Sequence, residues 1–115
     1  QKNIMFSIHM YEYAGAYGAV QNNIDSSLAV GAPLCIGEFG IKHTNGPIDY
    51  KTIMSYSQAK GVGYLGWSWK GNSSELAYLD MVQDWAGTQL TEQGNAILND
   101  QNGIKNTSKS CSIFE

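Results

Sequence analysis

Strand-like and helix-like segments alternate along this chain, and the alternation limits its possible folds more than any other feature. The strand-like segments are short apolar, β-branched or aromatic runs bounded by turn formers, at residues 3–9, 33–37 and 63–69. Each precedes a segment with a helical pattern, at residues 20–28, 50–57 and 91–97. The predicted inward faces are Val20, Ile24 and Leu28 on the first, Tyr50, Ile53, Met54 and Ser57 on the second, and Ala96 and Ile97 on the third. Strands separated by helices form parallel sheets covered by helices, so the sequence predicts an α/β fold.

Capping residues mark the expected ends of the helices. Gly31 is expected to end the first helix, and Asp49 and Gly61 are expected to begin and end the second. Residues 42–47 are expected to form a loop. The long connection before the third helix is expected to be a packed loop, because it contains Leu76, Leu79, Met81 and Trp85.

The chain length bounds how much of a larger α/β fold can be present. The chain has 115 residues, 43% of them hydrophobic, which suits a single globular unit. A complete (β/α)8 TIM barrel needs about 250 residues, so three βα units correspond to roughly the last three-eighths of one. The alternative is a small self-contained domain with three parallel strands, but its sheet would have two open edges that need cover. We therefore expect residues 1–115 to be the C-terminal part of a single (β/α)8 domain.

The charge balance argues against nucleic acid as a partner. Seven lysines stand against ten acidic residues, which gives a net charge of -3 and no basic cluster. No apolar run approaches the roughly 20 residues that span a bilayer, so no membrane partner is expected. Cys35 and Cys111 lack the spacing of a zinc or redox site, and we expect them to be unlinked rather than joined in a disulfide. No metal ion and no cofactor are predicted.

Reactive or aromatic residues stand at the end of each predicted strand. His9 and Tyr11 end the first, Glu38 follows the second, and Trp67 lies near the end of the third. The carboxyl ends of parallel barrel strands open onto one face, where active sites are built, so these side chains are expected to converge. The period-two alternation of a strand also places Ser7, His9 and Tyr11 on one side.

Glu38 is the strongest candidate for a chemical role. Strand alternation places Leu34, Ile36 and Glu38 on the same side, and a carboxylate that ends a barrel-facing row is poorly explained by packing. The alternative is a solvated charge at a strand end. Taken singly, His9 fits a core histidine equally well, and Trp67 fits a core aromatic.

Three motifs resemble one known enzyme family. Residues 6–11 (FSIHMY), 36–40 (IGEFG) and 66–72 (GWSWKGN) resemble strands six, seven and eight of family 5 glycoside hydrolases. The sequence is most similar to those of bacterial endo-β-1,4-mannanases, and the resemblance extends over nearly the whole chain. The resemblance implies a retaining endo-β-1,4-mannanase that is secreted and acts on β-mannan, with this chain as the C-terminal part of its catalytic domain. An endo-β-1,4-glucanase of the same family and a non-catalytic carbohydrate-binding fragment are the alternatives.

The resemblance also implies a role for each strand-end residue. Glu38 would be the nucleophile that forms a glycosyl-enzyme intermediate. Tyr11 would donate its hydroxyl to Glu38, and His9 would stand between the two catalytic carboxylates. Trp67 would form the apolar floor under the reacting sugar, with Trp69 as the second choice for that platform.

The chain departs from the family pattern at the second catalytic carboxyl. A retaining mechanism needs an acid/base about 5 Å from the nucleophile, and the family carries it in an Asn-Glu pair that this sequence lacks. The family's arginine near the nucleophile is also absent. The expected partner is therefore a complementary N-terminal barrel segment that carries the acid/base, and this chain is expected to be inactive without it.

Overall fold

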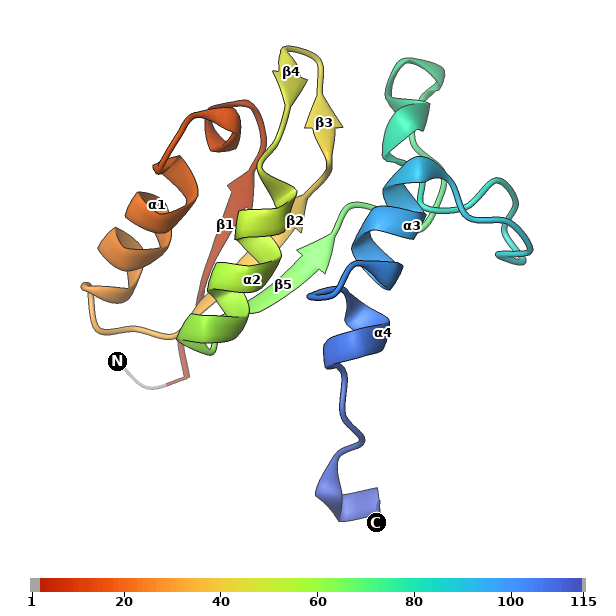
Figure 1. Ribbon diagram of the computed structural model, residues 1–115. Helices are drawn as coiled ribbons and strands as arrows, with labels where there is room; N and C mark the ends of the chain where they lie inside the picture. The colour runs from red at the N-terminus through yellow and green to blue at the C-terminus, as the bar shows by residue number, and fades with distance from the viewer. Residues whose placement is uncertain (1–2, 115) are drawn as a thin grey trace.

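The computed structural model describes residues 3–114 and contains a three-stranded parallel sheet (Figure 1). Its strands are β1 (Phe6–Met10), β2 (Leu34–Phe39) and β5 (Gly63–Gly66), in the order β1-β2-β5. The helices are α1 (Ala19–Leu28), α2 (Tyr50–Lys60), α3 (Glu92–Asn99) and α4 (Ile104–Thr107). A small antiparallel hairpin of β3 (Lys42–His43) and β4 (Gly46–Pro47) stands between β2 and α2, and 3₁₀ turns cover Glu12–Gly15, Ser74–Leu79 and Ser112–Phe114. The predicted α/β class with parallel strands is confirmed.

Helices α1 and α2 begin and end close to where the sequence predicts. The Asp49 carboxylate accepts the backbone N–H of Thr52 at 3.2 Å, which caps α2. Gly61 ends this helix in the left-handed conformation, and Gly31 follows α1 in the same conformation. The buried faces are also as predicted, with Val20 and Ile24 on α1 and Ile53, Met54 and Ser57 on α2.

Helix α3 lies tightly against the long connection that precedes it. The Thr91 side chain accepts the backbone N–H of Gly94 at 3.1 Å and caps the helix. A Cβ atom at Gly94 would overlap the backbone carbonyl of Met81, so glycine is required for this approach. Ile97 is fully buried and Ala96 is half-buried, which agrees with the predicted inward face.

The three strands and the segment 42–47 differ from their predictions. The second strand covers 34–39 rather than 33–37, so Glu38 lies within it rather than after it. The first strand covers 6–10 rather than 3–9, and residues 42–47 form the β3–β4 hairpin rather than a loop. The third strand ends at Gly66 instead of residue 69, because the backbone of Ser68 hydrogen-bonds to Leu79 and Met81 rather than to a strand. In the long connection Leu79 and Met81 are buried and Leu76 is half-buried as expected, but Trp85 is 69% exposed.

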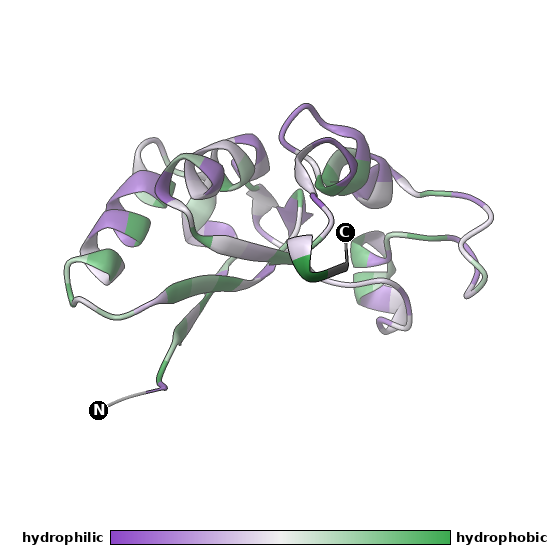
Figure 2. Ribbon diagram, turned by 90° about the horizontal axis from the view of Figure 1, so that it is seen from below, coloured by the Kyte–Doolittle hydropathy of each residue, from purple (hydrophilic) through white to green (hydrophobic). Residues whose placement is uncertain are grey.

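The hydrophobic core lies between the sheet and the helices that cover one of its faces (Figure 2). On the sheet side it consists chiefly of Met10, Ile36 and Phe39, and on the helix side of Ile24, Ile53, Met54 and Ile97. On the other face Ser7, His9 and Leu65 are exposed. Among the described residues, no strand pairs with the outer edges of β1 and β5. One face and two edges of the sheet are therefore open.

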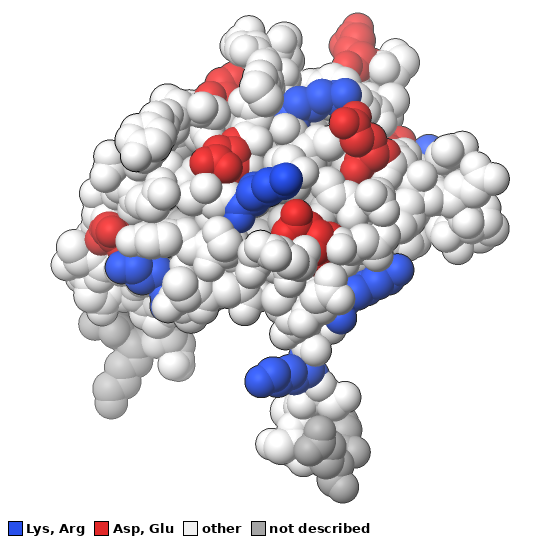
Figure 3. Space-filling model, in the orientation of Figure 1, with Lys and Arg blue, Asp and Glu red and all other residues white. Residues whose placement is uncertain are grey.

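The surface carries interspersed charges of both signs. In the orientation of Figure 3, lysines lie beside acidic residues, and ion pairs join Lys60 to Asp25 at 2.8 Å and Lys42 to Glu92 at 3.3 Å. Within residues 3–114 no helix has the length and apolar character to cross a membrane. Cys35 is half-buried, Cys111 is exposed, and both are free in this structure.

Candidate active site

Glu38 lies at the carboxyl end of β2, next to the end of β1. Ile8 pairs with Ile36, but His9 pairs with Glu38, so the register between the two strands shifts by one residue. Gly37 is the extra residue on β2, and such a bulge changes the direction in which the following side chains point. The bulge therefore sets the direction of the Glu38 side chain at the end of the strand.

The predicted alternation along this strand is wrong because of the bulge. Leu34 and Ile36 are buried in the core against the helices, whereas Glu38 points to the open side of the sheet. A Cβ atom at Gly37 would overlap the hydroxyl of Ser7, so a larger residue there would require the Ser7 side chain to turn away. Leu34, Ile36 and Glu38 therefore do not share one side of the strand as predicted. Leu34 and Ile36 face the helices, and Glu38 faces the opposite side.

Tyr11 and Glu38 form the central contact of the site. The Tyr11 hydroxyl donates to Glu38 Oε2 at 2.9 Å. Partial burial raises the pKa of Tyr11, and the hydrogen bond to Glu38 with its negative charge raises it further. Tyr11 therefore stays protonated and remains a donor to the carboxylate across the physiological pH range.

His9 approaches the same carboxylate oxygen. Its Nδ1 atom lies 3.4 Å from Glu38 Oε2, and the imidazole is 53% exposed on the open face. Both described partners of Glu38 thus contact Oε2, and among residues 3–114 no hydrogen bond is made to Oε1. One oxygen of the carboxylate is therefore contacted by Tyr11 and His9, and the other has no hydrogen-bond partner among the described residues.

Trp67 is anchored beside the end of β2. Its backbone N–H donates to the carbonyl of Phe39 at 2.9 Å, and the peptide bond between Trp67 and Ser68 is cis. The indole is 42% exposed, and its Nε1–H donates to Asn72 Oδ1 at 2.9 Å. The backbone of Trp67 is therefore fixed next to Phe39, the residue that follows Glu38, and part of the Trp67 ring is exposed to solvent.

Trp69 lies apart from this group. Strand alternation predicts that Trp67 and Trp69 share the inward face, but β5 ends at Gly66 and the alternation stops there. The Trp69 indole N–H donates to the backbone carbonyl of Trp85 at 3.3 Å, and its ring packs on Gly87. Trp69 thus belongs to the long connection rather than to the strand end.

Gln93 is a buried residue of this region that the sequence analysis missed. Its Oε1 accepts the backbone N–H of Ile41 at 2.9 Å, and its Nε2 donates to the backbone carbonyl of Trp67. With 1% exposure, the side chain links the chain after β2 to the chain after β5. The one signal in the sequence was its spacing from Ile97, because residues four apart lie on the same face of a helix.

The β3–β4 hairpin also contacts the site. The His43 ring lies 4.8 Å from the Tyr11 ring between centroids and pairs with the Glu12 carboxylate. The backbone hydrogen bond of Glu12, followed by the His43 hydrogen bond, holds the pKa of Glu12 below its ordinary value. The Tyr78 ring packs edge-on against His43 at 6.4 Å. These residues cover one side of Tyr11.

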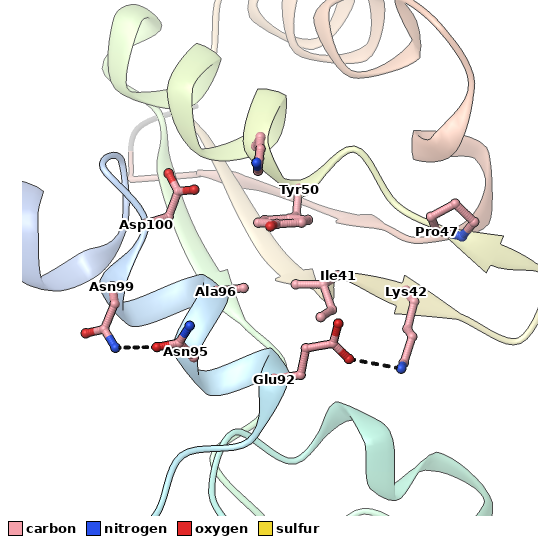
Figure 4. Close-up of a pocket in the computed structure, with 10 residues that line it drawn as sticks. Ile41, Lys42, Pro47, Tyr50, Glu92, Asn95, Ala96, Asn99 and Asp100 are labelled. Carbon is pink, nitrogen blue, oxygen red and sulfur yellow. Dashed lines mark hydrogen bonds and ion pairs between the residues drawn. The ribbon is translucent and has the colours of Figure 1, made fainter.

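A cavity of about 430 Å³ lies elsewhere, between α2, α3 and the β3–β4 hairpin (Figure 4). Tyr50, Asn95, Asn99 and Asp100 line it, and the Lys42–Glu92 ion pair stands at its edge. None of the predicted site residues lines this cavity. Within residues 3–114 no group of three or more histidine, cysteine or acidic residues is suited to hold a metal ion.

The arrangement can provide an oriented carboxylate next to an aromatic surface. Tyr11 and His9 contact one oxygen of Glu38, and Trp67 is hydrogen-bonded through its backbone to Phe39, the next residue, with its indole partly exposed. A carboxylate of this kind is suited to nucleophilic attack or to stabilising positive charge, and an indole face is suited to the C–H face of a sugar ring. The structure thus brings His9, Tyr11 and Glu38 into contact and places Trp67 after the neighbouring strand, whereas Trp69 contacts Trp85 and Gly87. The roles assigned to these residues stay predictions.

Comparisons with known proteins agree on one family. A family model described as Cellulase (glycosyl hydrolase family 5) matches residues 1–73. The chain is 53% identical over 114 residues to a mannan endo-1,4-beta-mannosidase from Salipaludibacillus agaradhaerens, covering 98% of this chain and 37% of that protein. A second mannan endo-1,4-beta-mannosidase, from Cellvibrio japonicus, is 43% identical, with 99% of this chain and 26% of the relative covered.

A solved structure gives the same result for the fold. The beta-mannanase from Thermomonospora fusca superimposes with a TM-score of 0.87 at 40% identity, over 96% of this chain and 37% of that one. The chain thus spans about a third of the relatives that it matches. Its three βα units are part of a (β/α)8 barrel, and the predicted fold class and family resemblance are confirmed. On the match of more than half its length to the family model, the chain belongs to glycoside hydrolase family 5.

Proposed function

We propose that this chain supplies the nucleophile side of the active site of a retaining endo-β-1,4-mannanase. The observation that carries the proposal is the hydrogen bond from Tyr11 to Glu38 at the ends of two adjacent parallel strands, 2.9 Å long. Active sites of (β/α)8 barrels are built at that end of the sheet. A family 5 member with an oriented carboxylate there is suited to double displacement.

Glu38 is the nucleophile in this proposal. Its Oε1 attacks the anomeric carbon while Tyr11 and His9 hold Oε2, so the carboxylate cannot rotate away from the sugar. The bond to the leaving oxygen breaks as that oxygen takes a proton from an acid on the opposite side of the linkage. Water then attacks the glycosyl-enzyme, gives its proton to the same acid/base, and restores the Glu38 carboxylate.

Trp67 is the platform for the sugar at the cleavage point. Its backbone is fixed to Phe39, the residue after Glu38, and its indole is 42% exposed. A pyranose presents a C–H face that packs on an aromatic plane. Mannan is the preferred polymer because the relatives above are named as mannosidases, and cellulose is the alternative from the description of the family model.

A complementary barrel segment is the proposed partner. The proposal is supported by the open edges of β1 and β5 and by exposed apolar side chains, among them Met5 at 61% and Leu65 at 59%. From the usual barrel size, a segment of about 150–200 residues would supply five further βα units and the acid/base. The assembled barrel, meaning this chain together with that segment, is proposed to be secreted, since it acts on a polymer.

Substitution of Glu38 in the assembled barrel tests the proposal. Glu38→Gln keeps the shape and removes the charge, and it should lower kcat on β-1,4-mannan by roughly a thousandfold or more. Glu75→Gln is the matched control, because Glu75 is exposed on the 3₁₀ turn Ser74–Leu79 and outside the site. Near-wild-type activity of Glu38→Gln would refute the nucleophile. A wild-type preference for soluble cellulose over mannan would replace the proposed substrate.

A further inference from the structure

The indole of Trp67 has one described hydrogen bond, which its N–H donates to Asn72. The backbone of Trp67 is fixed by Phe39 and Gln93, but these contacts do not set the rotation of the ring. The ring itself is 42% exposed, and its described polar contact is the bond from Nε1 to Asn72 Oδ1 at 2.9 Å. The contacts that hold Asn72 therefore bear directly on how the ring is oriented.

The side-chain amide of Asn72 has only one workable orientation. Its Nδ2 donates to Asp80 Oδ1 at 2.7 Å and to Ser68 Oγ at 3.1 Å. An indole N–H can only donate and an ionised carboxylate can only accept, so the amide must point its oxygen at Trp67 and its nitrogen at Asp80. The backbone N–H of Asn72 also donates to Asp80 Oδ1, at 3.1 Å. Asp80 thus fixes both the position and the direction of Asn72.

Asp80 is itself a buried and well-anchored carboxylate. The residue is 6% exposed, and Lys70 Nζ lies 3.1 Å from its Oδ2. Burial alone would raise the pKa of Asp80, but the hydrogen bonds from Asn72 and the charge of Lys70 outweigh burial and lower it. The Asp80 carbonyl accepts the hydroxyl of Thr91, the cap of α3. The network therefore connects Trp67 to the helix layer of the barrel.

We propose that Asn72 and Asp80 are positioning residues that set the orientation of the Trp67 platform. The inference rests on the function proposed above, in which Trp67 lies under the reacting sugar. Neither residue needs to touch the substrate. Asn72 acts through the indole N–H, and Asp80 acts through Asn72, so their effect on turnover depends on the presence of that N–H.

A double-mutant cycle in the assembled barrel tests this dependence. Asn72→Ala should lower kcat/KM on β-1,4-mannohexaose roughly tenfold, the size of one lost hydrogen bond. Phenylalanine at position 67 keeps an aromatic face but has no N–H, so adding Asn72→Ala to Trp67→Phe should cost less than about twofold further. Asn22→Ala, an exposed asparagine on α1, is the matched control and should change nothing. Equal tenfold losses in both backgrounds would mean that Asn72 acts on folding alone and would overturn the proposal.

A second measurement does not depend on activity. In the NMR spectrum of the assembled barrel, the indole N–H signal of Trp67, identified by its absence in Trp67→Phe, should move in Asn72→Ala and also in Asp80→Asn. The indole signal of Trp69, which is bonded to Trp85, should stay in place as an internal control. An unmoved Trp67 signal in both variants would overturn the positioning role. Wild-type protein that does not hydrolyse mannohexaose would refute the proposed function instead, and the indole signal would still decide the network.

Discussion

Replacing Gln93 by leucine tests how the two strand ends of the site are joined. The substitution keeps the approximate volume of the side chain and removes both hydrogen bonds of its amide group. One is accepted from the backbone N–H of Ile41, and the other is donated to the backbone carbonyl of Trp67. Ile41 is 8% exposed, so its N–H would be left buried without a partner at a cost of about 1–3 kcal/mol. The Trp67 carbonyl also loses a donor, and the loss of this second hydrogen bond costs about 1 kcal/mol. The expected loss in the free energy of unfolding is therefore about 2–4 kcal/mol.

Urea denaturation of the assembled barrel measures this loss. Tryptophan fluorescence and circular dichroism should be followed together, since coincident transitions justify a two-state treatment. The midpoint should fall while the slope with urea stays the same. Gln101→Leu, the same change at an exposed position, should stay within about 0.5 kcal/mol of wild type. If Gln93→Leu also stays within that range, Gln93 does not join the two strand ends.

Three further predictions concern packing, pH and substrate binding. Gly94→Ala places a methyl group against the backbone carbonyl of Met81 and should lower the free energy of unfolding by at least about 2 kcal/mol. Gly63→Ala meets only the sulfur of Cys35 at 3.6 Å and should lower it by less than about 1 kcal/mol, and thermal unfolding compares the two variants. Because the folded pKa of Glu12 is lowered, its contribution to stability is present above the unfolded pKa of about 4.3 and is lost as the pH falls through the folded pKa. Denaturation should therefore show a larger deficit for Glu12→Gln at pH 6 than at pH 3, and an equal deficit would contradict the pairing. Trp67→Ala should lower kcat/KM on mannan more than Trp69→Ala, and equal losses would contradict the platform.

The helices could be predicted because their signals are local. The cap at Asp49, the glycine at Gly61 and the buried Ile53 and Met54 follow from spacing within a dozen residues of sequence, and the structure has all of them. The parallel sheet followed from the alternation of elements. The convergence of Glu38 with Tyr11 followed in turn from the parallel topology.

The features that were missed depend on contacts between distant segments. The bulge at Gly37 depends on how closely β1 approaches β2, and no local pattern in β2 records that distance. The early end of β5 follows from backbone bonds between Ser68 and residues 79–81. Polar side chains such as Gln93 and Asp80 resemble surface residues in sequence, because their buried partners are backbone groups or residues of other segments.

The most direct measurement of the central claim is the stereochemistry of azide rescue at Glu38. Glu38→Ala in the assembled barrel should abolish hydrolysis of an aryl β-mannoside with a good leaving group, because no glycosyl-enzyme can form. Azide can enter the space that the carboxylate vacates and attack the same carbon from the same side, which restores turnover. The Glu38 nucleophile predicts a product of inverted configuration, an α-mannosyl azide identified by NMR. A retained β-mannosyl azide would instead make Glu38 the acid/base, and near-wild-type hydrolysis without azide would leave it no catalytic role.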